Sequence, residues 1–385
     1  MRRAWVPALI GTLLGLSWQL LTVHYNYGGN LTALFCTGSY YPTPPSLAGE
    51  HIYVFPNSGG YDGQSYHYVA HDPLCRSDIG RAVPDPMLRY PRILLPGLAY
   101  LAALGRQPWI DVSYIACNLG FLFLGCWWLA RLFIRLRIHP WFAAFYVLVP
   151  AALTSLDRLV VDLALTSLCL GFAIYASSGE KWKLYAVLAA AALCRESGFL
   201  LTAAYALHML ALRRFRLGLF FVTAILPAVA WNAYVVLRIP GGPAFDPRSV
   251  MPFWGLIQSL WRPTSYPFGP VTNAAIRAFD GLELAGLTLA LALAFRNLRK
   301  ALFDPVRTAC WLWAVFGLTL SEPVWADCYT GAPRILSPLL LFVFLRSFAG
   351  GGKLGRLPLA MVVPRVWLEV APQVLGVLRG VWYGS

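Results

Sequence analysis

A series of apolar runs dominates this chain, and several of them approach the roughly 20 residues that a helix needs to cross a bilayer. Of the 385 residues, 58% are hydrophobic and 12% are charged, and the mean hydropathy is +0.59, which excludes an ordinary soluble domain. The runs lack the alternation of barrel strands, and backbone polar groups in lipid must be satisfied within each segment. The sequence therefore predicts an all-α polytopic membrane protein.

The lengths of the runs predict about ten transmembrane helices, within a range of roughly eight to eleven. We expect an N-terminal transmembrane anchor at 1–23, a large extracytoplasmic first loop with interfacial helices at 24–110, a transmembrane helical core at 111–348 and a basic cytoplasmic tail at 349–385. The expected spans lie at about 5–23, 111–131, 141–156, 158–176, 184–194, 198–212, 217–237, 281–296, 306–322 and 335–348.

The net charge of +14 follows a positive-inside pattern. With a cytoplasmic N-terminus, successive basic clusters fall inside, and of the 17 acidic residues only Glu180, Asp304 and Glu369 lie away from the outer face. The charge is therefore expected to set orientation and to contact membrane lipids, and no nucleic-acid partner is expected. The basic clusters are Arg2/Arg3, Arg131/Arg135/Arg137, Lys181/Lys183, Arg213/Arg214/Arg216, Arg296/Arg299/Lys300 and Lys353/Arg356.

The eight cysteines are scattered without a CxxC pair, so neither a zinc site nor a redox site is expected from them. Cys36 and Cys75 share the outer loop and are left open as a disulfide or as two free thiols. The first apolar run has a basic start, but residues 21–25 offer no small-residue cleavage site. We therefore expect this run to remain as an uncleaved anchor.

The outer loop contains the most distinctive motif, which spans residues 60–68 and reads GYDGQSYHY. The preceding Asn-Ser-Gly-Gly predicts a turn just before Asp62, and a short helix is expected over Ser65–Ala70. A carboxylate held at a membrane surface can accept the proton of an acceptor hydroxyl, an effect of roughly 10²–10⁴-fold. Gly60 and Gly63 would let the backbone approach the substrate closely. The plain alternative is a turn in which Asp62 only caps backbone N–H groups.

Two apolar segments are too short or too interrupted for simple spans. Residues 93–104 form either a short span or an interfacial helix, and the interfacial alternative preserves the charge pattern. Residues 184–194 and 198–212 are half-length helices that meet at Arg195-Glu196, and a polar break at membrane depth requires a cavity. Arg195 is therefore a candidate ligand for a donor phosphate, with Glu196 holding it in place.

Three stretches carry a resemblance to a known family: Tyr61-Asp62-Gly63-Gln64-Ser65-Tyr66, Asp72-Pro73 and Arg89-Tyr90-Pro91-Arg92-Ile93-Leu94-Leu95-Pro96. With the order of anchor, outer loop and surface helix, the chain resembles integral-membrane glycosyltransferases of the GT-C superfamily, in a bacterial branch linked to cell-surface glycopolymers. The similarity is best over residues 1–215.

The resemblance implies a GT-C-like fold, a sugar donor carried on a polyprenyl phosphate and a catalytic base at Asp62. Tyr61, Gln64 and Tyr66 of the same motif are then candidate substrate contacts. The commoner family pattern has two adjacent acidic residues, whereas Asp62 is followed by glycine. We therefore expect no cofactor, and a divalent metal is left open without support.

Besides Arg195, three arginines are candidate contacts for the lipid phosphate. Arg89 and Arg92 end the outer loop, where paired guanidinium groups could hold a phosphate in a fixed fork, although arginines at a membrane edge also extend simply to reach headgroups. Arg334 begins the final span, where the resembling enzymes place a basic residue against the lipid phosphate.

Asp157 and Arg158 are further candidate substrate contacts, at the outer end of the predicted span 158–176. Charges within a membrane are costly and by default mark a cavity. The plain alternative is structural, because Arg158 and Asp162 have the i,i+4 spacing of an ion pair on one helix.

Asp72 is a candidate second carboxylate that orients the acceptor, although aspartate before proline is more often a turn former. His67 and His71 are four residues apart, as zinc ligands on a helix can be, but no third ligand is evident. Solvated or hydrogen-bonded histidines are therefore the default expectation.

These observations favour an enzyme that moves a sugar from a polyprenyl-phosphate donor to a glycan, lipid or protein acceptor. Its active site is expected to face outward from a bacterial cytoplasmic membrane. The alternative is a transporter or flippase for a lipid-linked or anionic solute, because broken helices and buried Arg/Glu pairs suit transport as well. No inverted repeat is visible and the polar residues concentrate in one outer loop, which favours the enzyme. A catalytically silent assembly subunit is a third alternative.

Overall fold

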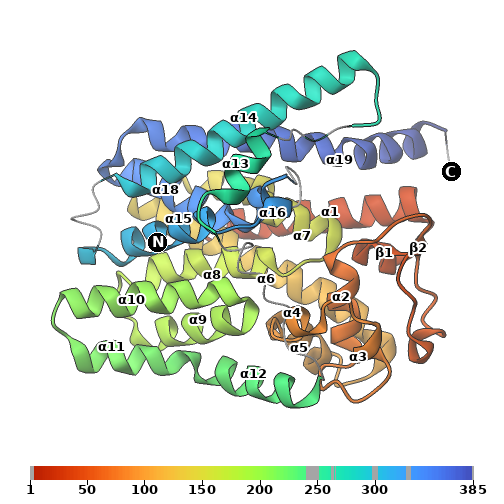
Figure 1. Cartoon of the computed structure of the whole chain (residues 1–385), viewed down its shortest axis with the longest axis horizontal. Helices are drawn as coiled ribbons and strands as arrows, with labels where there is room; N and C mark the ends of the chain where they lie inside the picture. Colours follow the sequence, from red (N-terminus) through yellow and green to blue (C-terminus); the bar gives the residue numbers. More distant parts are fainter. Residues whose placement is uncertain are drawn as a thin grey trace.

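The computed structural model describes residues 4–239, 251–261, 264, 266–296, 302–326 and 331–383. Helices make up most of these residues (Figure 1), and the strands among them are β1 (Thr37–Gly38) and β2 (Val54–Phe55), which pair in parallel. The predicted all-α class is therefore confirmed. Four residues of the predicted basic clusters lie outside the described part of the chain: Arg2, Arg3, Arg299 and Lys300.

Five helical segments of the described residues are long and apolar enough to cross a membrane. A sixth results if η3 (Pro140–Leu148) and α7 (Pro150–Arg158), which are bent by 55°, count as one span. The chain is thus a multi-pass α-helical membrane protein. The five segments are α1 (Trp5–Tyr27), α6 (Gln107–Arg135), the run Phe215–Arg238 with α11 (Phe215–Val222) and α12 (Leu226–Arg238), α14 (Pro270–Phe295), and the run Lys353–Tyr383 with α19 (Leu357–Tyr383).

The predicted count of about ten spans is not met, because several apolar runs fold into short helices. α8 (Asp162–Tyr175), α9 (Lys181–Cys194) and α15 (Pro305–Leu318) have 14 residues each, and α10 (Phe199–Ala211) has 13. Fourteen residues rise about 21 Å, short of the roughly 30 Å of a hydrocarbon core. Every residue of α8 is buried within the protein, so its apolar character reflects packing in the core.

Of the predicted loop at 24–110, residues 28–106 lie between the long apolar helices α1 and α6 and fold into short helices. The helix predicted near Ser65–Ala70 is α2 (Asp62–His71), which starts earlier than expected. α5 (Leu94–Ala102) has nine residues and rises about 14 Å, which excludes the full-span alternative for 93–104. Cys36 and Cys75 are free thiols, so no disulfide joins them. The remaining helices of this region are η1 (Leu31–Phe35), η2 (Pro45–Leu47), α3 (Ile79–Ala82) and α4 (Pro86–Arg89).

Residues 28–106, which the sequence predicts to lie outside the cytoplasm and which we call the outer region, have a small apolar core of their own, to which the end of α12 contributes. Trp231 Nε1 of α12 donates a hydrogen bond to the carbonyl of Tyr90 at 2.8 Å, and Tyr234 Oη donates to the carbonyl of Leu74 at 2.8 Å. These bonds fasten the outer helices to the membrane core. The residues of this small core are Leu47, Tyr68, Val69, Ile79, Val83, Tyr90, Val235 and Ile239.

α6 lies at the centre of the main core, because α1, α5, η3 and α8 all pack against it. α14 and α19 run beside each other along one edge of the molecule (Figure 1). α17 (Ala332–Ile335), which precedes α18 (Ser337–Arg346), contacts α7 and so brings the C-terminal third of the chain to the outer region. α13 (Trp254–Trp261) packs on α16 (Glu322–Ala326).

The segment 349–385 contains α19, which lies within a candidate span of 31 residues. Its length and hydropathy permit a membrane crossing as well as the predicted position on the inner surface. The helix continues through Pro364 and Pro372 and packs against both α14 and α1.

Candidate functional site

Seven charged side chains from distant parts of the chain meet beside the N-terminal end of α2. The carboxylates come from the first residues of α2, α8 and η4 (Glu196–Gly198). The guanidinium groups come from the end of α4, the turn before α5, the break between α9 and α10, and α17. We call this group the arginine–carboxylate cluster: Asp62, Arg89, Arg92, Asp162, Arg195, Glu196 and Arg334.

Asp62 bridges two of these arginines. Its Oδ1 accepts a hydrogen bond from Arg89 Nη2 at 2.7 Å, and its Oδ2 accepts one from Arg334 Nη2 at 3.0 Å. Burial alone would raise the pKa of Asp62, but Arg334 and Arg89 outweigh burial and hold this pKa well below its ordinary value. The Asp62 side chain is 21% exposed, so this ionised carboxylate can be reached from solvent.

Glycines explain how α2 brings Asp62 to this place. A Cβ atom added at Gly63 would lie 2.3 Å from the carbonyl oxygen of Arg158 and 2.8 Å from that of Phe35. Only glycine therefore lets α2 begin so close to the end of α7. Gly60 has φ of 69°, and a Cβ there would lie 2.6 Å from the backbone nitrogen of Gly38. Both glycines allow close approach, as expected, but to neighbouring protein backbone instead of to a substrate.

Asp162 joins Arg195 to Arg334 in the protein interior. Arg195 Nη1 donates to Asp162 Oδ1, and Arg334 Nη1 lies 3.5 Å from Asp162 Oδ2. All three side chains are buried. Like Asp62, Asp162 lies in the first turn of its helix, where the aligned peptide dipoles favour a negative charge. The two carboxylates thus share Arg334.

The predicted i,i+4 ion pair between Arg158 and Asp162 is wrong, because one residue breaks the helix between them. Leu159 adopts a left-handed conformation with φ of 43° and separates α7 from α8. Arg158 Nε lies instead 3.5 Å from Asp157 Oδ2. The Arg158 guanidinium also lies 5.0 Å from the centre of the Tyr61 ring, and the Arg334 guanidinium lies 5.2 Å from the centre of the same ring. The predicted substrate contacts Tyr61, Asp157 and Arg158 therefore border the cluster.

Arg92 and Glu196 form the second half of the cluster. Arg92 Nε and Nη2 donate to the two Glu196 oxygens at 2.9 and 2.7 Å, and Arg92 Nη1 donates to Tyr66 Oη at 2.9 Å. Arg195 Nε lies 3.3 Å from Glu196 Oε1. Burial would raise the pKa of Glu196, but Arg92 and Arg195 lower it to about 2. Arg92 is 4% exposed and Glu196 is 48% exposed, so Glu196 forms a solvent-facing edge of the cluster.

The cluster has unfilled hydrogen-bond donors. Arg89 Nε and Arg334 Nε are buried and have no hydrogen-bond partner among the residues that the structure describes, and Arg334 Nη1 has only its 3.5 Å ion-pair contact with Asp162. Its four guanidinium groups and three carboxylates give a net charge of 4 − 3 = +1. An anion with several acceptor oxygens would match both the free donors and the excess charge.

Two predicted substrate contacts, Gln64 and Asp72, have structural partners outside the cluster. Gln64 is buried, accepts a hydrogen bond from the Gly38 backbone N–H at 3.1 Å and donates to Tyr68 Oη at 3.3 Å. The Asp72 carboxylate accepts hydrogen bonds from the backbone N–H groups of Arg76 and Ser77 at 2.8–2.9 Å. The turn-forming alternative therefore accounts for Asp72.

His67 and His71 are buried instead of solvated. The Nε2 atoms of both rings approach Asp111 Oδ1 of α6, at 2.8 Å and 3.1 Å. The sequence reasoning missed Asp111, although an acidic residue one turn into a long apolar helix is itself a signal, because such a charge is costly without a partner. These three residues do not belong to the arginine–carboxylate cluster.

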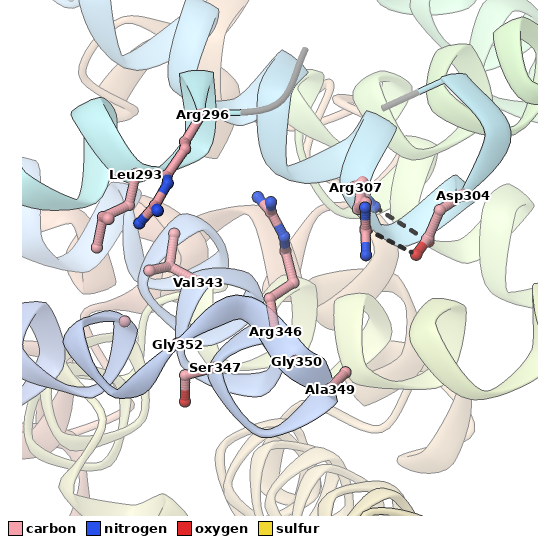
Figure 2. Close-up of a pocket in the computed structure, with 11 residues that line it drawn as sticks. Leu293, Arg296, Asp304, Arg307, Val343, Arg346, Ser347, Ala349, Gly350 and Gly352 are labelled. Carbon is pink, nitrogen blue, oxygen red and sulfur yellow. Dashed lines mark hydrogen bonds and ion pairs between the residues drawn. The ribbon is translucent and has the colours of Figure 1, made fainter. Parts of the chain in front are cut away.

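A second group of arginines lines a separate cavity of about 240 Å³ at the C-terminal end of α18 (Figure 2). Arg296, Arg307 and Arg346 extend toward this cavity, and Arg307 Nε pairs with Asp304 Oδ2 at 3.3 Å. The cavity shares no residue with the arginine–carboxylate cluster. Arg296 belongs to a predicted cytoplasmic cluster, so membrane orientation is a sufficient explanation for these charges.

Comparisons of the chain with protein-family models, with curated proteins and with solved structures gave no match. The resemblance to the GT-C superfamily therefore stays a prediction from sequence.

Proposed function

We propose that this protein is a membrane glycosyltransferase of the GT-C type, which moves a sugar from a polyprenyl-phosphate donor to a hydroxyl group of a glycan, lipid or protein. The observation that carries the proposal is an ionised, reachable Asp62 held between two arginines that still have free N–H groups. The positive-inside pattern supports a reaction at the extracytoplasmic side of a bacterial cytoplasmic membrane.

In the proposed reaction, the acceptor oxygen attacks C1 of the donor sugar while the bond from C1 to the phosphate oxygen breaks. The electron pair of that bond leaves with the lipid phosphate, and the acceptor proton passes to Asp62. The charge on the phosphate rises from about −1 to about −2, so the nearby guanidinium groups stabilise the transition state more than the bound donor.

The pairing of Asp62 with two arginines affects its strength as a base. A carboxylate with a lowered pKa accepts a proton weakly. A donor phosphate bound at the free N–H groups of Arg89 and Arg334 would compete with the carboxylate for both guanidinium groups, and its negative charge raises the pKa of Asp62. In this mechanism the arginines keep Asp62 ionised before the donor binds and release it as a base afterwards.

The remaining members of the cluster have positioning roles in this proposal. Arg92 holds Tyr66 and Glu196, and Asp162 holds Arg195 and Arg334. Fixed donors need no rearrangement when charge develops on the leaving group, which is how a preorganised site accelerates a reaction.

Sugar transfer is tested by the Asp62→Asn variant, with surface glycans analysed by mass spectrometry beside those of cells that lack the gene. We expect the variant to fold and to lose transfer. Asp78→Asn is the matched control, because Asp78 is an outer carboxylate that bonds to the exposed Ser46. Full transfer by Asp62→Asn would contradict the proposal.

A transporter or flippase for a lipid-linked or anionic solute is the second candidate function. The observation in its favour is Arg195, a buried cation in extended conformation (φ −164°, ψ 152°) at the break between α9 and α10. Broken helices of this kind line binding sites in transporters. Accumulation of substrate in proteoliposomes, without any glycosylated product, would favour this candidate over the enzyme.

A further inference from the structure

The group formed by His67, His71 and Asp111 has the composition of a metal site. Both histidines lie on one face of α2, four residues apart, and Asp111 reaches them from α6. The donor atoms of the three side chains all lie within 4.8 Å of one another. Both imidazole rings are buried, and Asp111 is 14% exposed.

The hydrogen bonds of His71 leave one of its ring nitrogens facing a carboxylate. Gln107 Nε2 donates to the His71 carbonyl at 3.2 Å, which orients the amide so that Gln107 Oε1 faces His71 Nδ1. Nδ1 therefore carries the hydrogen, and in a neutral imidazole Nε2 then has a lone pair. This Nε2 lies 3.1 Å from Asp111 Oδ1, a contact that needs a cation to be favourable.

His67 has the same need for a partner. Its side chain is fully buried and stacks on the Phe35 ring at 4.1 Å. Its Nδ1 makes no hydrogen bond to a described residue, and its Nε2 lies 2.8 Å from Asp111 Oδ1, the same oxygen that His71 Nε2 approaches. Two imidazole nitrogens that converge on one buried carboxylate oxygen are held most favourably by a cation between them, because a metal ion can accept a lone pair from each of the three groups.

The spacing and the surroundings suit a transition metal. Zinc–ligand bonds of about 2.0–2.2 Å place neighbouring donor atoms of a tetrahedron roughly 3.3 Å apart, so these donors would have to move by about 0.5–1.5 Å. The bond from His71 Nδ1 to Gln107 is the kind of outer contact that orients metal-binding histidines. Imidazole and carboxylate together favour zinc and similar divalent ions over magnesium or calcium.

We propose that His67, His71 and Asp111 bind one divalent transition-metal ion of the zinc type, with water in the fourth position. The metal would fasten α2 to α6 and so fix the helix whose first residue is Asp62. It would act as a structural brace outside the arginine–carboxylate cluster. The inference does not depend on the proposed sugar transfer, because its test measures metal binding.

The test uses the full-length protein, purified without a histidine tag, stripped with a chelator and then equilibrated with zinc chloride. Asp111→Asn and His71→Gln remove ligands while they retain polar groups of similar size. His208→Gln is the matched control, because His208 is a buried histidine that bonds to the carbonyl of Leu302, away from this site. Thermal unfolding in chelator shows first that each variant folds.

We expect about one zinc ion per chain for the wild type and for His208→Gln, and an affinity at least roughly 100-fold lower for both ligand variants. Gln107→Ala should lose about 10- to 100-fold, as removal of an outer-shell partner does. Zinc should raise the unfolding temperature of the wild type and of His208→Gln, but not that of Asp111→Asn or His71→Gln. Equal zinc content in the wild type and Asp111→Asn would overturn the proposal.

Should a ligand variant fail to fold, X-ray absorption at the zinc edge of the loaded wild type decides the matter. We expect nitrogen and oxygen ligands at about 2.0–2.2 Å with the scattering pattern of two imidazole rings. A spectrum with fewer than two imidazoles, or a wild type without bound zinc, would mean that the three residues share only protons.

Discussion

Neutralising Asp62 is expected to tighten the binding of polyprenyl phosphate while it removes sugar transfer. In the wild type the Asp62 carboxylate occupies Arg89 and Arg334, at 2.7 and 3.0 Å, so it competes with an incoming phosphate for the same guanidinium groups. Asp62→Asn keeps the shape of the side chain but removes the competing charge. Binding and catalysis should therefore change in opposite directions.

The size of the effect follows from the separation of the charges. A phosphate at the free Nε atoms of Arg89 and Arg334 would lie about 6–7 Å from the Asp62 carboxylate, and at an effective dielectric constant of about 20–40 two unit charges repel there by about 1–3 kcal/mol. Each 1.4 kcal/mol is about a factor of ten in affinity. Since Asp62 is partly exposed and salt screens it, we expect binding about 5- to 30-fold tighter.

The assay is equilibrium binding of polyprenyl phosphate, the leaving group of the proposed reaction, to purified protein in detergent. Asp78→Asn serves as the control for the loss of an outer carboxylate and should bind as the wild type does. Arg334→Gln should bind more weakly by about 10-fold or more, because it removes a charged donor. Raising the salt concentration should reduce the difference between Asp62→Asn and the wild type.

Unchanged or weaker binding by a folded Asp62→Asn variant would refute this reasoning. It would mean that the lipid phosphate does not share the arginines of Asp62, and that these arginines serve only as structural counter-ions. Loss of transfer with unchanged binding would leave Asp62 as a base but would remove the exchange of partners from the mechanism.

Three further predictions concern the stability of the site. Asp162→Asn leaves Arg195 and Arg334 without their buried counter-ion and should destabilise the protein by about 3–5 kcal/mol, measured by thermal unfolding in detergent. Gly63→Ala should cost about 1–3 kcal/mol because its Cβ meets backbone at 2.3 Å, whereas the control Gly120→Ala, with no atom within 4 Å of its Cβ, should not destabilise. Because the folded pKa of Asp62 is lowered, its contribution to stability is complete above the unfolded pKa of about 3.9 and is lost as the pH falls toward the folded value. The stability difference between the wild type and Asp62→Asn should therefore be constant from about pH 7 to 5 and should shrink below about pH 4.

The gathering of the charged residues could be anticipated from the sequence, because charges in apolar surroundings must find partners. Arg195 is a candidate on this ground, whereas Asp62 and Arg334 are candidates from the resemblance and Arg89 and Arg92 from their place at the end of the loop. The structure brings all five together from segments up to 272 residues apart. Chain order gave no information on which arginine meets which carboxylate. That pairing depends on how α2, α8 and α17 pack, which is a tertiary property.

The number of spans could not be obtained from apolar run length alone. An apolar run that is buried among other helices has the same composition as an apolar run that faces lipid. α8 is the clearest example, because all of its residues are buried. The predicted ion pair between Arg158 and Asp162 is wrong for a local reason. The i,i+4 spacing brings two side chains together only within an unbroken helix, and Leu159 ends α7 between them. Asp111 was missed because its partners lie 40 and 44 residues earlier, at His71 and His67.

The unfilled donors of Arg89 and Arg334 favour the proposed anion-binding site over a purely structural ion-pair network. A network that served only to hold helices together would be most stable with every buried donor paired, because each unpaired one costs about 1–3 kcal/mol. The cluster instead leaves Arg89 Nε and Arg334 Nε without a partner among the described residues, gives Arg334 Nη1 only a 3.5 Å ion-pair contact with Asp162, and carries one positive charge in excess. Burying arginines next to carboxylates is a poor way to gain stability, since apolar side chains of similar volume often do better. The same arrangement is useful if an anion completes it, because the fixed donors are then already oriented toward the incoming charge.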